Sequence, residues 1–139
     1  MVGLDTNVIV RYLAQDDPKQ SALASRFIER KLTAAHPGFI SLVVLVETCW
    51  VLRSLFSVDE EELVSTLQDM LNTAQFHFER RDVVMAAIGQ RDTGLGRRAG
   101  FADLLIAQLS KAAGCTHTVT FDKAAARSAG MRSLTPLSG

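Results

Sequence analysis

The sequence predicts an α/β fold with a mostly parallel central sheet of four to five strands and helices on both faces. Short apolar segments alternate with longer segments whose apolar residues recur at helical spacing. Strands that alternate with helices imply crossover connections, and these connections pair strands in parallel. The chain has 139 residues, is 47% hydrophobic and contains no Pro-rich or Gly/Ser-rich linker, which predicts one domain over residues 1–139.

The first half of the chain predicts two strands and four helices. Thr6 and Asn7 offer capping side chains after a short apolar strand, Pro18 suits a first helical turn, and Ser41 is a plausible cap. The expected order is strand 2–4, helix 6–13, a helix from Asp16 that ends near His36, strand 39–40, helix 42–56, and a helix that opens with the acidic run 59–62. The helix over 42–56 is apolar nearly all round, so we expect it to be buried on most sides, with Trp50 packed in the core.

The second half continues the alternation. We expect a strand over 75–78, a helix over 83–88, a glycine-containing loop over 92–100, a helix over 101–113, a strand over 116–121, a short helix over 122–129 and a possible fifth strand over 131–134.

Charge and composition restrict the classes of partner. Fifteen basic and fifteen acidic residues balance, so a polyanion would have to bind to a local basic patch. The two cysteines, Cys49 and Cys115, are too few for a disulfide scaffold and are expected to be reduced thiols of the core. The longest apolar stretch, 42–52, is too short to span a bilayer and is interrupted by Glu47, so we expect a cytoplasmic protein without a membrane partner.

Acidic residues within apolar segments carry the functional signal. The four are Asp5, Glu47, Asp103 and Asp122. None has an evident basic partner at helical spacing, and burial of an ionised carboxylate costs several kcal/mol unless it is compensated. Asp5 and Asp122 each follow a strand, where ligands of parallel sheets lie. The sequence therefore predicts one acidic pocket for one or two Mg²⁺ or Mn²⁺ ions.

Such a pocket suits hydrolysis of a phosphodiester by a water molecule whose pKa a divalent cation lowers. No persuasive Ser/His/Asp or Cys/His arrangement, phosphate-binding loop or zinc-ligand spacing accompanies the acids, and we assign none of the three histidines to a metal. Simpler interpretations remain open for single residues. Asp5 and Asp122 could be helix caps, and Asp103 could favour the dipole of its helix. Glu47, in the middle of an apolar helix, has neither explanation.

Four segments in the same order resemble the PIN-domain proteins, and at this length the VapC-type toxins of bacterial toxin–antitoxin pairs. The segments are LDTNVIVRYL, SLVVLVETCWVL, GFADLLIAQLSKAAGC and TVTFDKAAARSAG. The resemblance implies a PIN fold, a three-layer α/β/α sandwich, and a metal-dependent endoribonuclease. It also implies a homodimer that is inhibited by a small antitoxin, whose C-terminal segment enters the acidic groove.

By the same resemblance, Asp5, Glu47 and Asp103 match the three most constant acids of the family, and Asp122 matches a less constant fourth. Four polar residues would support them: Thr6 and Asn7 in the DTN signature, Thr120 before Asp122, and Ser41, which is more simply a cap. Candidate contacts to RNA phosphates are Arg97 and Arg98 in the glycine-containing loop, together with Arg11 and Lys123. The substrate would be single-stranded or looped RNA.

Two other functions remain open. An aspartate-nucleophile phosphatase also places an acid after the first strand of a parallel sheet, but here the residue two positions later is Asn7 rather than a second acid. Alternatively, the pocket could belong to a catalytically silent binding module that docks an arginine-bearing partner.

Overall fold

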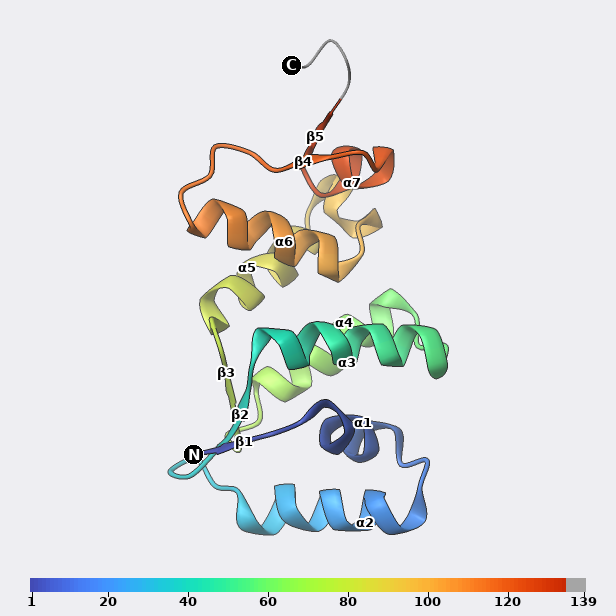
Figure 1. Cartoon of the computed structure of the whole chain (residues 1–139), viewed down its shortest axis with the longest axis vertical. Coiled ribbons are helices and arrows are strands. Elements are labelled where there is room, and N and C mark those ends of the chain that lie inside the picture. Colours follow the sequence, from blue (N-terminus) through green and yellow to red (C-terminus); the bar gives the residue numbers. More distant parts are fainter. Residues whose placement is uncertain (135–139) are drawn as a thin grey trace. The chain divides into compact units, whose positions relative to one another are not determined.

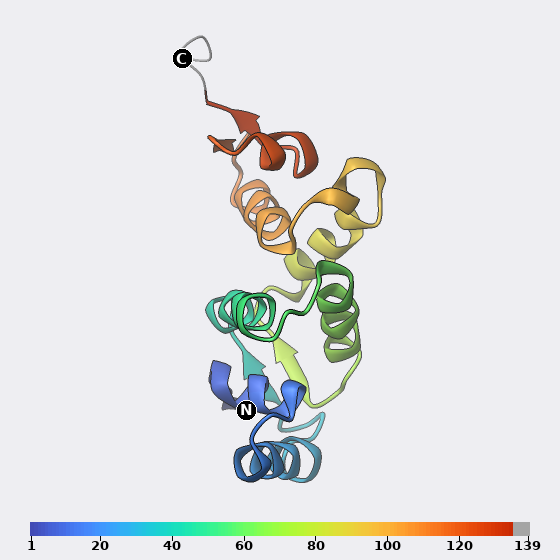
Figure 2. The same cartoon turned by 90° about the vertical axis from the view of Figure 1, so that its right-hand side faces the viewer.

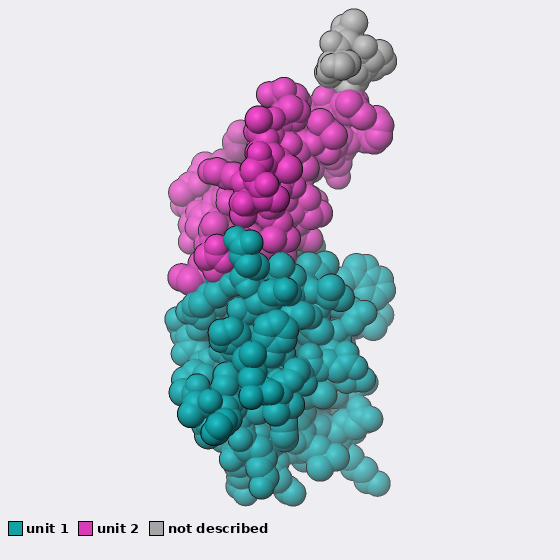
Figure 3. Space-filling model, turned by 60° about the vertical axis from the view of Figure 1, so that its left-hand side comes forward, with its two compact units in different colours: residues 1–81 teal, residues 82–139 magenta. Residues whose placement is uncertain are grey.

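The structure is a computed structural model that describes residues 1–134. Its chain forms two compact units, residues 1–81 and residues from 82 onward (Figure 3). Within residues 1–134 it contains seven α-helices and five short strands, all paired in parallel. The predicted α/β class and the parallel pairing are therefore confirmed.

Unit 1 is a three-stranded sheet with four helices. Its elements are β1 (Val2–Gly3), α1 (Thr6–Ala14), α2 (Pro18–Arg26) with a π turn (Phe27–Lys31), β2 (Gly38–Ile40), α3 (Leu42–Leu55), α4 (Glu60–Leu71) and β3 (Phe76–Phe78). The strand order is β1-β2-β3. Figures 1 and 2 show helices α1 to α4 on one side of this sheet. Right-handed crossovers that step twice in the same direction place their helices on the same face.

Gly38 leaves room for two core leucines beside the pairing of β1 with β2. Gly38 lies opposite Val2 in one strand and Phe76 in the other. A Cβ atom on Gly38 would lie 2.6 Å from Cδ1 of Leu4 and 2.8 Å from Cδ1 of Leu32. Because Gly38 has no side chain, Leu4 and Leu32 can pack over the strand. Leu4 directly precedes Asp5, so this packing helps to position Asp5.

Helix α3 is less buried than the sequence predicts. Ser41 caps it as expected, because its Oγ accepts a hydrogen bond from the N–H of Val44 at 3.2 Å. The buried face consists of Leu45, Thr48, Cys49 and Leu52, whereas Val43, Val46, Trp50 and Leu55 are exposed. The expectation that this helix is buried on most sides was wrong. Its apolar residues lack the periodic polar face that would have distinguished the packed side from the open one.

Unit 2 contains the remaining helices and a two-stranded sheet. Its elements are α5 (Arg81–Arg91, which begins at the last residue of unit 1), a 3-10 turn η2 (Gly94–Arg98), α6 (Phe101–Ala112), β4 (Val119–Thr120), α7 (Lys123–Ser128) and β5 (Arg132–Ser133). The strand predicted over 116–121 is limited to two residues, which pair with Arg132 and Ser133. The five expected strands thus occur in two sheets, and the single domain and three-layer sandwich stay predictions.

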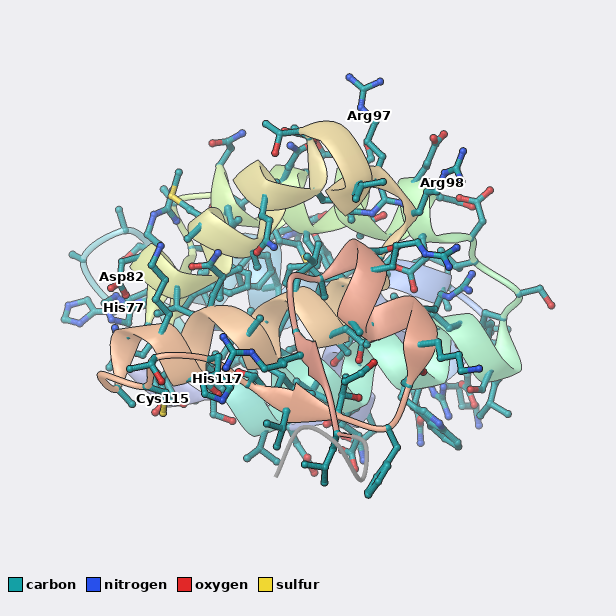
Figure 4. The ribbon with its side chains drawn as sticks, turned by 90° about the horizontal axis from the view of Figure 1, so that it is seen from above. His77, Asp82, Arg97, Arg98, Cys115 and His117 are labelled. Atoms are coloured by element: carbon teal, nitrogen blue, oxygen red, sulfur yellow. The ribbon has the colours of Figure 1, made fainter. Side chains whose placement is uncertain are left out.

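Both cysteines were expected in the core, and the structure buries one of them. Cys49 is buried in α3, as predicted. Cys115 is exposed, in the turn that follows α6 and contains Gly114 with a φ of +97° (Figure 4). The prediction of a second core thiol was wrong because the apolar segment of α6 ends before this turn.

Among the described helices, none is both long and apolar enough to cross a membrane.

Candidate metal site and nucleic-acid groove

Asp5 lies where the chain passes from β1 into α1. The N–H of Leu4 donates to the carbonyl of Phe39 at 2.9 Å, which ties the end of this segment to β2. Asp5 is the N-cap of α1, and its Oδ1 accepts a hydrogen bond from the N–H of Thr6 at 2.8 Å. The capping interpretation of Asp5 is therefore correct, but the side chain is also exposed to solvent and lines a groove.

Thr6 connects this corner to Glu47, 41 positions away in α3. The Thr6 side chain is 7% exposed, and its hydroxyl donates a hydrogen bond to Oε1 of Glu47. This hydrogen bond holds one carboxylate oxygen of Glu47 against Thr6, which directly follows Asp5. The DTN resemblance assigned Thr6 a supporting role, but no pattern in the sequence indicated Glu47 as its partner.

A groove of about 500 Å³ is lined by residues at and around α1 and α3, including both acids. Its polar lining consists of Asp5, Thr6, Asn7, Arg11, Asp16 and Glu47, and its apolar lining consists of Val10, Trp50, Val51, Leu55 and Phe56. Unit 1 by itself thus brings together two of the four predicted acids and two of the supporting residues, Thr6 and Asn7.

Arg11 is the one basic residue in the lining of this groove. Its guanidinium forms an ion pair with Asp16 at 3.1 Å and donates through Nε to Oε1 of Gln20 at 2.9 Å. These partners hold Arg11 at the wall of the groove, where a phosphate could compete with Asp16 for the guanidinium.

The acids are more accessible than the sequence argument assumed. Asp5, Glu47 and Asp122 are exposed, and Asp103 is half-buried. The inference that their burial demands a countercharge was wrong, because apolar neighbours in sequence do not imply burial: Val46 beside Glu47 and Phe121 beside Asp122 are themselves exposed. Support for a metal site therefore comes from the two carboxylates that line one groove, Asp5 and Glu47, and not from the cost of desolvation.

Asp122 is held differently from Asp5. It is the N-cap of α7, and its Oδ1 accepts from the N–H groups of Ala124 at 2.8 Å and Ala125 at 3.0 Å. Thr120 supports the same turn, since its Oγ1 accepts from the N–H of Asp122 at 3.0 Å. The capping interpretation is therefore confirmed for Asp122, and Thr120 acts on this cap.

The other predicted residues of unit 2 lie on two elements. Asp103 is in the first turn of α6. Arg97 and Arg98 are exposed on η2, with both side chains directed outward (Figure 4). Lys123, directly after Asp122, is also exposed.

The residues of unit 1 fit a hard divalent cation by their chemistry. Asp5 and Glu47 offer carboxylate oxygens in an accessible groove, and oxygen is the ligand that Mg²⁺ and Mn²⁺ prefer. Neither unit alone, over the described residues, gathers three or more His, Cys, Asp or Glu side chains able to hold a metal ion. The convergence of all four acids therefore stays a prediction.

Trp50 lies in the groove, although the sequence predicted it in the core. Its surface is 63% exposed, and it lines the groove with Asp5 and Glu47. Its position three residues after Glu47 indicates that the two residues share a helix face. Because the neighbouring residues of the helix are also apolar, the sequence did not show that this face is exposed.

Comparison with known proteins identifies the family. The sequence profile of the PIN domain matches residues 2–131, which include parts of both units. A comparison with curated proteins gives no match. Together with the α/β fold and its parallel strands, the match over nearly the whole chain shows that this protein belongs to the PIN-domain family, whose members are mostly metal-dependent nucleases.

Proposed function

We propose that the protein is a divalent-metal-dependent endoribonuclease and the toxin of a toxin–antitoxin pair. The observation that carries the proposal is the Asp5–Thr6–Glu47 arrangement, in which one buried threonine positions the Glu47 carboxylate in the same groove as Asp5. Paired carboxylates in an accessible groove are suited to a metal-dependent nuclease, which is the prevailing activity of the family.

The residues of the groove have separate tasks in this proposal. Asp5 and Glu47 would hold Mg²⁺ or Mn²⁺, one ion or two, and Thr6 keeps Glu47 oriented. Asn7 would orient Asp5 or a water molecule, and Arg11 would bind a phosphate of the substrate. A bound divalent cation would lower the pKa of a water molecule and offset charge at the scissile phosphate. Asp103 and Asp122 stay predicted members of the same ligand set, on the strength of their motifs.

The toxin role rests on the resemblance of the four motifs to VapC-type proteins. It includes a cytoplasmic location, a homodimer and a small antitoxin whose terminal segment enters the acidic groove. Arg97, Arg98 and Lys123 are exposed cations that would add contacts to the RNA backbone.

The central test is cleavage of single-stranded RNA with Mg²⁺ or Mn²⁺, with and without a chelator. Asp5→Asn and Glu47→Gln should each lower cleavage by at least about 100-fold, because loss even of residues that only orient metal ligands costs 10–100-fold. Glu61→Gln, an exposed acid of α4, is the matched control and should cleave as the wild type does.

Cleavage that persists in chelator and in both groove variants would refute the metal-dependent mechanism. RNA binding without cleavage would instead support a binding module. Growth arrest on expression, relieved by a small neighbouring gene, would separate a toxin from a housekeeping nuclease.

A further inference from the structure

One wall of the acidic groove carries an exposed indole. Trp50 lies one helical turn after Glu47 in α3, and residues at this spacing have Cβ atoms about 5–6 Å apart on the same face. Both side chains line the groove, together with Asp5 from the start of α1. The indole is therefore next to the carboxylates and not on a remote part of the surface.

Beyond Glu47, the groove residues of α3 around Trp50 are apolar, whereas most groove residues at and around α1 are polar or charged. Val51, Leu55 and Phe56 line the groove beside the indole, and none of them can form an ion pair with a phosphate. The charged side holds Asp5, Asp16 and Arg11. A ligand with a charged part near the carboxylates and Arg11 and a flat apolar part against Trp50 would therefore match this lining.

A nucleotide of single-stranded RNA has these two parts. Its phosphate suits the metal-binding acids and Arg11, and its base suits an aromatic face, on which bases of any identity stack. An unpaired base is required, because a base inside a duplex has no free face.

We propose that Trp50 is the stacking platform for one unpaired base beside the phosphate that is cleaved. This inference rests on the proposed nuclease function and specifies its substrate: RNA with an unstacked base next to the scissile bond. Stacking selects for that conformation more than for one base, so the groove discriminates single-stranded from paired RNA.

The chain offers a direct optical test, because Trp50 is its single tryptophan. Asp5→Asn protein, which should bind without cleavage, is titrated with a single-stranded RNA oligonucleotide while tryptophan fluorescence is recorded. Stacking should quench the emission, and a duplex of the same sequence should not. Quenching by both, or by neither, would overturn the proposal.

Substitutions of Trp50 distinguish the contribution of an aromatic ring from that of a merely apolar side chain. Trp50→Phe should retain most of the cleavage, whereas Trp50→Leu should raise KM for single-stranded RNA by about 5- to 150-fold, the range expected for one stacked base. A substrate with one abasic nucleotide next to the cleaved bond should remove the difference between Trp50→Leu and wild type. Val43→Ala, on the same helix at 77% exposure but outside the groove, is the control and should leave KM unchanged.

The outcomes distinguish this inference from the proposed function. Wild type that cleaves RNA while Trp50→Leu cleaves equally well overturns the stacking role alone. Wild type that does not cleave overturns the nuclease and the inference together. If Trp50→Leu instead converts a dimer to a monomer in sedimentation, with fluorescence insensitive to RNA, the indole belongs to a self-association surface and the proposal is overturned.

Discussion

Units 1 and 2 each place an aspartate between a short parallel strand and a helix, yet they use it differently. Asp5 accepts one backbone hydrogen bond and adjoins Thr6, which reaches Glu47 in another helix. Asp122 accepts two backbone hydrogen bonds from its own helix, and Thr120 supports the same turn. The first corner is joined to a distant acid, whereas the hydrogen bonds of the second are local. A strand–Asp–helix pattern therefore predicts a cap in both places, but it does not predict which of the two caps adjoins a distant acid.

The units also differ in the environment of their thiols, and this contrast gives the largest expected effect. Burial, with a further contribution from the nearby Glu60 carboxylate, raises the pKa of Cys49 from 9.0 to about 12. Cys115 is exposed. Because the thiolate is the reactive form, we expect Cys115 to be alkylated by iodoacetamide at pH 8 at least about 100-fold faster than Cys49. Mass spectrometry of the digested protein measures both rates.

The control for that experiment is the unfolded chain. In denaturant the two thiols should react at similar rates, because the burial that protects Cys49 is lost. Equal rates of alkylation in the native protein would mean that the packing of α3 against the core does not shield Cys49.

Thr6 tests whether the long-range contact matters for the acids. Thr6→Val keeps the shape of the side chain but removes the hydroxyl that holds Glu47. We expect it to weaken Mn²⁺ binding and cleavage by about 10- to 100-fold, as for other residues that orient metal ligands. Calorimetry for the metal and an RNA cleavage assay provide the two measurements.

Thr6→Ser restores a hydroxyl at the same position and should recover most of the wild-type behaviour. A valine variant that binds metal and cleaves normally would show that the contact with Glu47 is structural and that the two acids act without it.

The smallest expected effect concerns the cap in unit 2. Asp122→Ala removes the acceptor of two N–H groups and should lower the free energy of unfolding by about 0.5–2 kcal/mol. Asp122→Asn keeps an acceptor oxygen and should be nearly neutral for stability. Urea denaturation measures both.

The same two variants test whether the negative charge of Asp122 has a role beyond the helix cap. If Asp122→Asn preserves stability but reduces RNA cleavage, Asp122 serves the site as well as the helix. If it preserves both, the residue is a cap alone, and the contrast with Asp5 is complete.

Much of the fold could be predicted because its signals are local. Ser41, Asp5 and Asp122 were recognisable as caps, and helices α1, α3 and α6 begin where the sequence indicated. The exposed side of α3 could not be predicted, since Val43, Val46 and Trp50 are as apolar as the residues that are buried. Strand β4 was predicted too long because the Thr-rich segment from 116 has strand propensity, while pairing with β5 covers only two residues.

The candidate site was predictable in part for the same reason. The types of residue identified Asp5 and Glu47, but the apolar surroundings in sequence suggested burial that the structure does not have. The contact from Thr6 to Glu47 depends on the packing of α1 against α3, which no local pattern encodes.

The groove has a consequence for synthesis of the protein. All of its lining residues lie between positions 5 and 56, within the part of the chain that forms unit 1. Chains are made from the N-terminus at about 5–20 residues per second, and compact units fold as they emerge from the ribosome. Unit 2 is synthesised after unit 1, so the acidic groove can form before α7 has emerged from the ribosome. A nascent chain would then already present a surface to which an inhibitor could bind.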